Sequence, residues 1–349
     1  MDTFAYHTQF WYLQIVLKSE AITRAGPALG TRLCFSQQGM KSYPVLGPFL
    51  DQALCSLNLL FVAGAHGPKP VELQMGTFSA VFFASIVIAN YESFRPDHRR
   101  SNAFAGTLAR ASSAFLLAGQ RITAGFTTPM QRFYTEWSTS SGLAATKARK
   151  NTDEEKLRAL LPESKYIWTT LFAMLGFVVP TLYLKLDQFS YFSLALWHPF
   201  PLYIWALNRI LPPILASIPS TRAVATTLLT LLVITVSGVT HYELLRDTVF
   251  GAYDLRDVFL LRPQKDTRSL AFGAHLLFQV DFLAVLITCL AIVLVGPRST
   301  LGAFVAKFVQ FAVISAIAGP GAGLIVVWAL GEFGLQRAYA SALKAKKAQ

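Results

Sequence analysis

Residues 74–92 read QMGTFSAVFFASIVIANYE, and this stretch decides the fold class. It carries no charged residue before its last one, Glu92. An apolar helix of about 20 residues is long enough to cross the hydrocarbon core of a bilayer. We therefore interpret this stretch as a transmembrane helix that ends on a carboxylate.

The composition of the whole chain agrees with that interpretation. Of its 349 residues, 53% are hydrophobic and only 14% are charged, whereas roughly a quarter of a soluble domain is charged. The formal net charge is +12. The basic residues lie between the apolar runs rather than in one patch, which favours lipid headgroups over nucleic acid as their partner. Cys34, Cys55 and Cys289 show no redox or metal-ligand spacing, so we expect no metal site.

Similar apolar runs recur along the chain and predict an all-α, polytopic transmembrane bundle of about eight spans, within a range of seven to nine. Two of them contain predicted breaks, at Pro199 and Pro201 and at the GPGAG stretch 319–323. The predicted spans are 45–64, 74–92, 103–123, 166–186, 190–211, 223–245, 274–296 and 303–331.

The segments outside these runs complete the expected domain organisation. Residues 1–44 are rich in aromatic residues and predict an interfacial or cytoplasmic segment. The bundle covers 45–331 and includes a polar loop, 134–165, with a short helix expected at 152–161. Residues 332–349 are expected to form a basic tail.

Four carboxylates lie inside the predicted spans: Asp51, Glu92, Glu243 and Asp281. Glu243 lies near the end of its span and would equally suit an interfacial position. Ionisable groups at membrane depth are costly and usually face a bundle interior, so each is a candidate functional residue. The alternative for Asp51 and Asp281 is a purely structural pairing with a basic side chain.

Glu92 has a possible partner in Arg95, because residues three positions apart share one face of a helix. A carboxylate paired with arginine stays ionised and is a poor proton donor, whereas one desolvated in an apolar pocket holds its proton at neutral pH. The sequence is compatible with both environments, and also with an ion pair at the end of a span.

His198 lies in LALWHPFPLYIW, where two prolines interrupt the predicted helix. Backbone carbonyls released in this way are tolerated at membrane depth only where a cavity or neighbouring groups satisfy them. The surrounding aromatic rings are suited to stabilising a cation, and they would equally suit an interfacial aromatic belt.

Four motifs carry a family resemblance: PFLDQAL (48–54), YESFRPDHRR (91–100), GFTTPMQRFY (125–134) and WHPFPL (197–202). On these motifs, most of residues 45–331 resembles the multi-span terpene cyclases of fungal meroterpenoid pathways, such as those making ascofuranone, ascochlorin and macrophorin. The chain is also similar to membrane proteins of indole-diterpene clusters.

The resemblance implies a metal-independent enzyme of secondary metabolism that starts cyclisation of a prenyl chain by protonation. It implies Glu92 as the proton donor or its partner, Asp51 and Asp281 completing an acidic cluster, and Arg95 orienting Glu92, with His198 as a base. The implied substrate is a lipophilic prenylated small molecule, the implied location is the endoplasmic reticulum membrane, and no cofactor is needed. Other enzymes of the pathway are possible partners.

Two other function classes fit the same residues. A transporter or channel would use buried carboxylates as a proton or cation relay, but would need a continuous polar path. A non-catalytic scaffold for pathway enzymes would account for the long polar loop and would need no buried acids.

Overall fold

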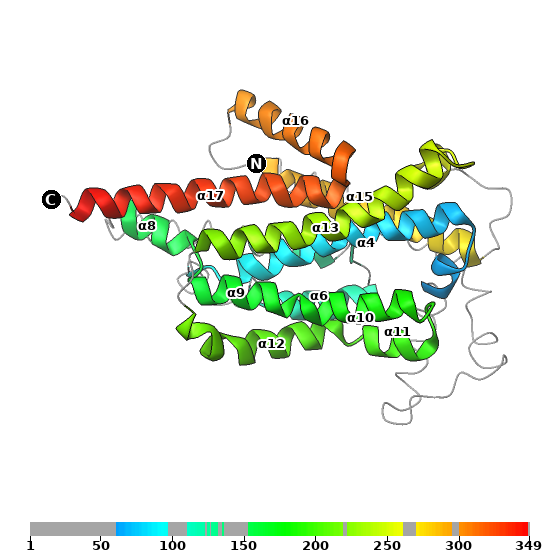
Figure 1. Cartoon of the computed structure of the whole chain (residues 1–349), viewed down its shortest axis with the longest axis horizontal. Helices are drawn as coiled ribbons and strands as arrows, with labels where there is room; N and C mark the ends of the chain where they lie inside the picture. Colours follow the sequence, from blue (N-terminus) through cyan, green and yellow to red (C-terminus); the bar gives the residue numbers. More distant parts are fainter. Residues whose placement is uncertain are drawn as a thin grey trace.

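The computed structural model describes residues 61–96, 110–122, 124–125, 127–131, 135, 153–218, 222–260, 270–294 and 300–347. These residues form helices and no strand, which confirms the predicted all-α class (Figure 1). The helices are α4 (Lys69–Ser93), α6 (Ser112–Ile122), α8 (Asp153–Leu160), α9 (Ser164–Ala173), α10 (Leu175–Leu186), α11 (Tyr191–Trp197), α12 (Phe200–Ile214), the short η2 (Leu215–Ser217), α13 (Arg222–Val249), α14 (Leu255–Phe259), α15 (Leu270–Leu294), α16 (Leu301–Ala318) and α17 (Pro320–Lys347).

Within the described residues, five helical segments are long and apolar enough to cross a membrane. They are Lys69–Ser93, Ser164–Leu186, Arg222–Val249, Gly273–Leu294 and Leu301–Ala318. The first four coincide with predicted spans, which supports an integral membrane protein.

Helix α4 lies at the centre of the bundle, and α9, α13, α15 and α17 pack around it (Figure 1). Most of its side chains are buried, among them Phe83, Val87 and Tyr91, which have no exposed surface. A helix that is apolar on every face is stable only when surrounded by other apolar groups. The stretch that decides the fold class therefore also forms the core.

Two contacts fix the register of the helices beside α4. The side-chain amide of Gln74 donates to the carbonyl oxygen of Phe278 on α15, at 3.4 Å. On α17, Gly321 lies so close to α4 that an added Cβ would be 2.6 Å from the carbonyl oxygen of Ala80. Because α4, α15 and α17 run in the same direction (Figure 1), the C-terminal end of α4 lies beside the middle of α17.

The predicted breaks are present, and they have different consequences. The fifth predicted span divides into α11 and α12 at His198 and Pro199, with Pro201 in the first turn of α12. At Gly319 the backbone has a φ of +89°, which glycine adopts without steric cost, and Pro320 begins α17. The chain reverses there, so 303–331 forms a helical hairpin rather than one continuous span (Figure 1).

Helices α8 and α17 test the predictions for the segments outside the central bundle. Helix α8 lies within the expected short helix at 152–161. Helix α17 continues to Lys347, so the boundary expected after residue 331 falls inside it. The N-terminal segment 1–44, most of the first predicted span and the beginning of the third lie outside the described residues.

Candidate active site

A buried charged cluster lies where the end of α4 meets α17. Its members are Tyr91, Glu92, Arg95, Trp328 and Glu332. Tyr91 and Glu92 occupy the last turn of α4, and Arg95 follows directly after it. Trp328 and Glu332 are four residues apart on α17 and therefore share one face of that helix. The cluster joins two helices that are far apart in the sequence.

Arg95 is the centre of this charged cluster. Its guanidinium binds Glu92 through Nε and through Nη2, the latter at 2.8 Å from Oε1, and Nη2 also donates to Glu332. Its Nη1 donates to the carbonyl oxygen of Leu160 at the end of α8. Burial alone would lower the pKa of Arg95, but the carboxylates of Glu332 and Glu92 outweigh burial and raise it well above its ordinary value. Arg95 therefore stays protonated.

Two aromatic side chains hold the carboxylates from the other side. The hydroxyl of Tyr91 donates to Oε2 of Glu332 at 2.8 Å, and the indole N–H of Trp328 donates to Oε1 of Glu92 at 3.2 Å. The rings of Tyr91 and Trp328 meet edge to face, with centroids 4.7 Å apart. Each carboxylate is thus fixed by the guanidinium and by one aromatic donor.

Two carboxylates of this cluster contact the same guanidinium. Only 13% of the Glu92 side chain and 4% of the Glu332 side chain are exposed. Like charges buried close together repel each other, and a proton taken up by one carboxylate relieves that repulsion. The arrangement therefore favours a proton on Glu92 or Glu332.

Two of the five members of this cluster, Glu92 and Arg95, were candidates from the sequence. Of the two environments that the sequence left open for Glu92, the structure shows the one paired with Arg95, because the two side chains form a salt bridge. Glu332 was missed, since it was assigned to the basic tail. The available signal was the four-residue spacing of Trp328 and Glu332, which becomes visible only if the helix is continued beyond residue 331.

A second feature, the aromatic cluster, fills the bundle next to the N-terminal half of α4. Phe61 and Phe278 have ring centroids 5.8 Å apart, and Phe61 and Trp197 are 5.0 Å apart. Further ring contacts extend the cluster across α4, α10, α12 and α15. Its members are Phe61, Phe78, Phe82, Phe83, Phe177, Trp197, Phe200 and Phe278.

His198 borders the aromatic cluster rather than the charged cluster. It is only 4% exposed, at the break between α11 and α12, and its ring centroid lies 6.2 Å from that of Phe61. The interruption by Pro199 places a polar ring among aromatic ones. His198 is therefore buried among aromatic side chains.

Asp281 also lies beside the aromatic cluster. It lies on α15 one turn after Phe278, whose ring contacts that of Phe78, and it is 5% exposed. Its carboxylate is close to the backbone of Gly125, where an added Cβ would be 2.6 Å from Oδ1. The structure thus places Asp281 and His198 along the aromatic cluster. Asp51 lies outside the described residues.

Two further acidic residues, Glu243 and Asp254, have local partners. Glu243 pairs with Lys185 at 2.5 Å on the surface. Asp254 caps α14 by accepting a hydrogen bond from the backbone N–H of Arg256 at 2.8 Å. Among the described residues, no group of three histidine, cysteine or acidic side chains is arranged to hold a metal ion.

Comparison with known protein families gives one match, to the CtvD domain, over residues 36–332. The match covers most of the chain, which therefore belongs to the CtvD domain family. This family is associated with terpene cyclases in fungal pathways, which points to a role in a secondary-metabolite pathway. No curated protein and no solved structure matches the chain.

Proposed function

We propose that this chain is a membrane-bound cyclase that protonates a prenyl chain on a meroterpenoid or indole-diterpene precursor and directs its ring closure. The observation that carries the proposal is the buried charged cluster, in which two carboxylates share one guanidinium. Membership of the CtvD domain family and the aromatic cluster beside α4 support it.

The pair of buried carboxylates supplies the acid. Glu92 and Glu332 contact the same guanidinium, their mutual repulsion favours a proton on one of them, and this proton is the one that the reaction uses. It passes to an epoxide oxygen or to a terminal alkene carbon, which leaves a carbocation on the prenyl chain. Arg95 then stabilises the second carboxylate that has formed.

The aromatic cluster supplies the environment for the cation. Phe82 and Glu92 are ten residues apart on α4, about 15 Å along the helix axis, which is within the reach of a chain of a few isoprene units. Internal double bonds attack the cation in turn, and ring faces stabilise the positive charge as it moves. His198 or Asp281 takes the final proton, so the product is an isomer of the substrate.

The proposal extends to the membrane compartment of the chain and to its number of membrane crossings. We place the chain in the endoplasmic reticulum membrane with about eight crossings, within the range of seven to nine. The five described spans account for part of this number. Helices α6, α11 with α12, and α17, together with the predicted span 45–64, would bring the number to nine, the upper end of that range.

The test is a product assay on membranes that contain the wild-type chain or its variants, fed with epoxidised and unepoxidised prenyl aromatic compounds. We expect wild type to make cyclic products of unchanged mass, separable by retention time. Glu92→Gln and Glu332→Gln should each lower the rate by about 10²- to 10⁴-fold, the usual range for loss of a general acid. Asp51→Asn, Asp281→Asn and His198→Gln test the other acids and the base.

Glu243→Gln is the matched control, because Glu243 is a carboxylate in an exposed ion pair with Lys185. It should leave the rate unchanged. If wild type converts none of the substrates, the cyclase proposal fails, and flux measurements would then test a transporter. If products form equally well without Glu92 and Glu332, the charged cluster is not the acid.

A further inference from the structure

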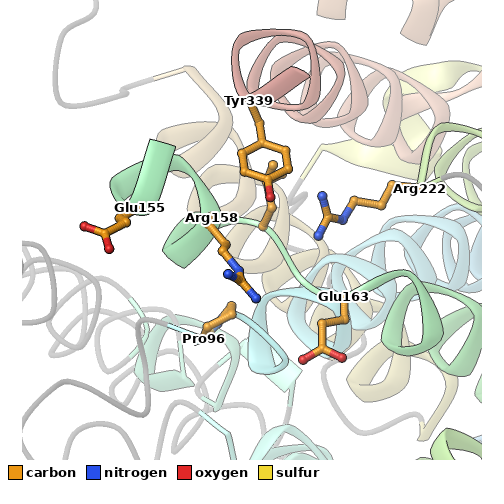
Figure 2. A pocket seen from close by; sticks show the side chains of 7 residues that line it. Pro96, Glu155, Arg158, Glu163, Arg222 and Tyr339 are labelled. Atoms are coloured by element: carbon orange, nitrogen blue, oxygen red, sulfur yellow. The ribbon is translucent and has the colours of Figure 1, made fainter. Parts of the chain in front are cut away.

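A cavity of about 470 Å³ opens at the end of the bundle beside the charged cluster (Figure 2). Four helical elements contribute to it: the segment after α4, α8 with the turn that leads into α9, α13 and α17. Its described lining residues are Pro96, Glu155, Arg158, Leu161, Glu163, Arg222 and Tyr339.

Two guanidinium groups face this cavity. Figure 2 shows Arg158 of α8, Arg222 of α13 and the hydroxyl of Tyr339 pointing toward the same space. Arg222 is held in place, because its Nε donates to the carbonyl oxygen of Pro162 at 2.9 Å and its Cζ lies 5.2 Å from the Tyr339 ring centroid. Its terminal nitrogens are directed into the cavity.

The carboxylates of the two acidic lining residues, Glu155 and Glu163, are directed away from the cavity or paired with another residue. The carboxylate of Glu155 points away from the cavity (Figure 2). The carboxylate of Glu163 pairs with Lys165, at 2.9 Å between Nζ and Oε2. Two guanidinium groups are thus directed into the cavity, with the planar donor geometry that suits carboxylate and phosphate groups.

The position of the cavity points to an amphiphilic ligand. Arg222 is the first residue of an apolar helix long enough to span a membrane, so the cavity lies at the level where the bundle meets the aqueous phase. Leu161 and the ring of Tyr339 add apolar surface beside the two arginines. An oxyanion would contact the guanidinium groups while its attached chain remained at the membrane.

The cavity is also connected to the charged cluster by two short links. Pro96 directly follows Arg95, and Leu161 directly follows Leu160, whose carbonyl oxygen accepts a hydrogen bond from Arg95. We infer that this cavity binds the anionic head group of an amphiphile, a carboxylate or a phosphate, through Arg158 and Arg222. Two sources share this chemistry: an acidic substrate, which rests on the proposed function, and an anionic phospholipid.

The experiment measures binding to the full chain in neutral phosphatidylcholine nanodiscs. One arm uses a farnesylated aromatic carboxylic acid and its methyl ester, and the other uses short-chain phosphatidic acid and short-chain phosphatidylcholine. We expect an anionic probe to bind more tightly than its neutral counterpart. The Arg158→Gln/Arg222→Gln double variant should weaken that binding at least tenfold and leave the neutral probes unaffected.

Arg209→Gln is the matched control, since Arg209 also lies over an aromatic ring, 5.7 Å from that of Trp205, but does not line the cavity. It should bind all probes as wild type does. The single variant Arg158→Gln removes an exposed side chain and keeps the test valid if the double variant unfolds. Preference for the acid identifies a substrate site, and preference for phosphatidic acid identifies a lipid site.

Equal binding of anionic and neutral probes would overturn the inference. So would anionic binding that is unchanged in both Arg158→Gln and the Arg158→Gln/Arg222→Gln double variant. Failure of the proposed function gives a different result. In that case the chain would cyclise no substrate and still bind an anionic probe through Arg158 and Arg222.

Discussion

The two ends of α4 both carry ion pairs, and they differ in burial and in charge balance. At the beginning of the helix, Lys69 pairs with Glu72 at 3.0 Å and with Asp247 at 3.3 Å. Arg246 pairs with Asp247 at 2.8 Å, so two cations face two carboxylates. Lys69 is 27% exposed and Arg246 is 52% exposed, so water screens this group.

At the other end of the helix, Arg95 is 8% exposed and contacts both Glu92 and Glu332; among the described side chains, two carboxylates face one cation there. Surface ion pairs contribute little to stability. Two carboxylates buried against one guanidinium depend on that cation and favour a proton on one of them. Burial and close carboxylates, rather than the presence of charge, distinguish the candidate active site.

The largest expected effect follows removal of the central cation. Arg95→Gln leaves two buried carboxylates without their guanidinium, and we expect it to lower the free energy of unfolding by about 3–5 kcal/mol. Denaturant titration of the detergent-solubilised chain measures this loss. The triple variant Arg95→Gln/Glu92→Gln/Glu332→Gln removes all the charges and should recover a large part of it. A triple variant no more stable than Arg95→Gln would show that the charges are not the cause.

A smaller effect is expected at the contact that sets α17 beside α4, and so brings Glu332 to Arg95. Gly321→Ala places a Cβ 2.6 Å from the backbone oxygen of Ala80, and we expect a loss of about 1–3 kcal/mol because that backbone has no room to move. Thermal unfolding of the same preparation measures the loss. The matched control is Gly331→Ala on the same helix, which meets nothing within 4 Å.

Gly331→Ala should change stability in the opposite direction, by about 0.5–1 kcal/mol, because alanine has the higher helix propensity. Equal stability of the two glycine variants would contradict the close packing of α17 on α4.

The smallest effect is expected at the exposed end of α4. Lys69→Met breaks its pairs with Glu72 and Asp247, and the free energy of unfolding should fall by less than about 1 kcal/mol. The difference from wild type should shrink further at 1 M salt, where the screening length is about 3 Å. A loss as large as that of Arg95→Gln would remove the distinction between the two ends.

Much of the architecture was predictable, because its causes are local. The apolar run 74–92 predicts a helix, and the three-residue spacing of Glu92 and Arg95 permits the pairing that the structure shows. The prolines near His198 and the GPGAG stretch predict breaks, since proline and glycine act on the backbone where they stand. That GPGAG reverses the chain was not predictable, because composition does not give the angle between α16 and α17.

Hydropathy by itself determined that this chain is a helical membrane protein, since apolar length and missing charge are properties of the sequence. Only the tertiary structure decided which helix is central: α4 and α16 are both apolar, yet α4 is largely buried and α16 is largely exposed. It also decided the site, because Glu332 reaches Arg95 across 237 residues of sequence. Contacts at that distance depend on how helices pack, and packing is a property of all the surfaces together.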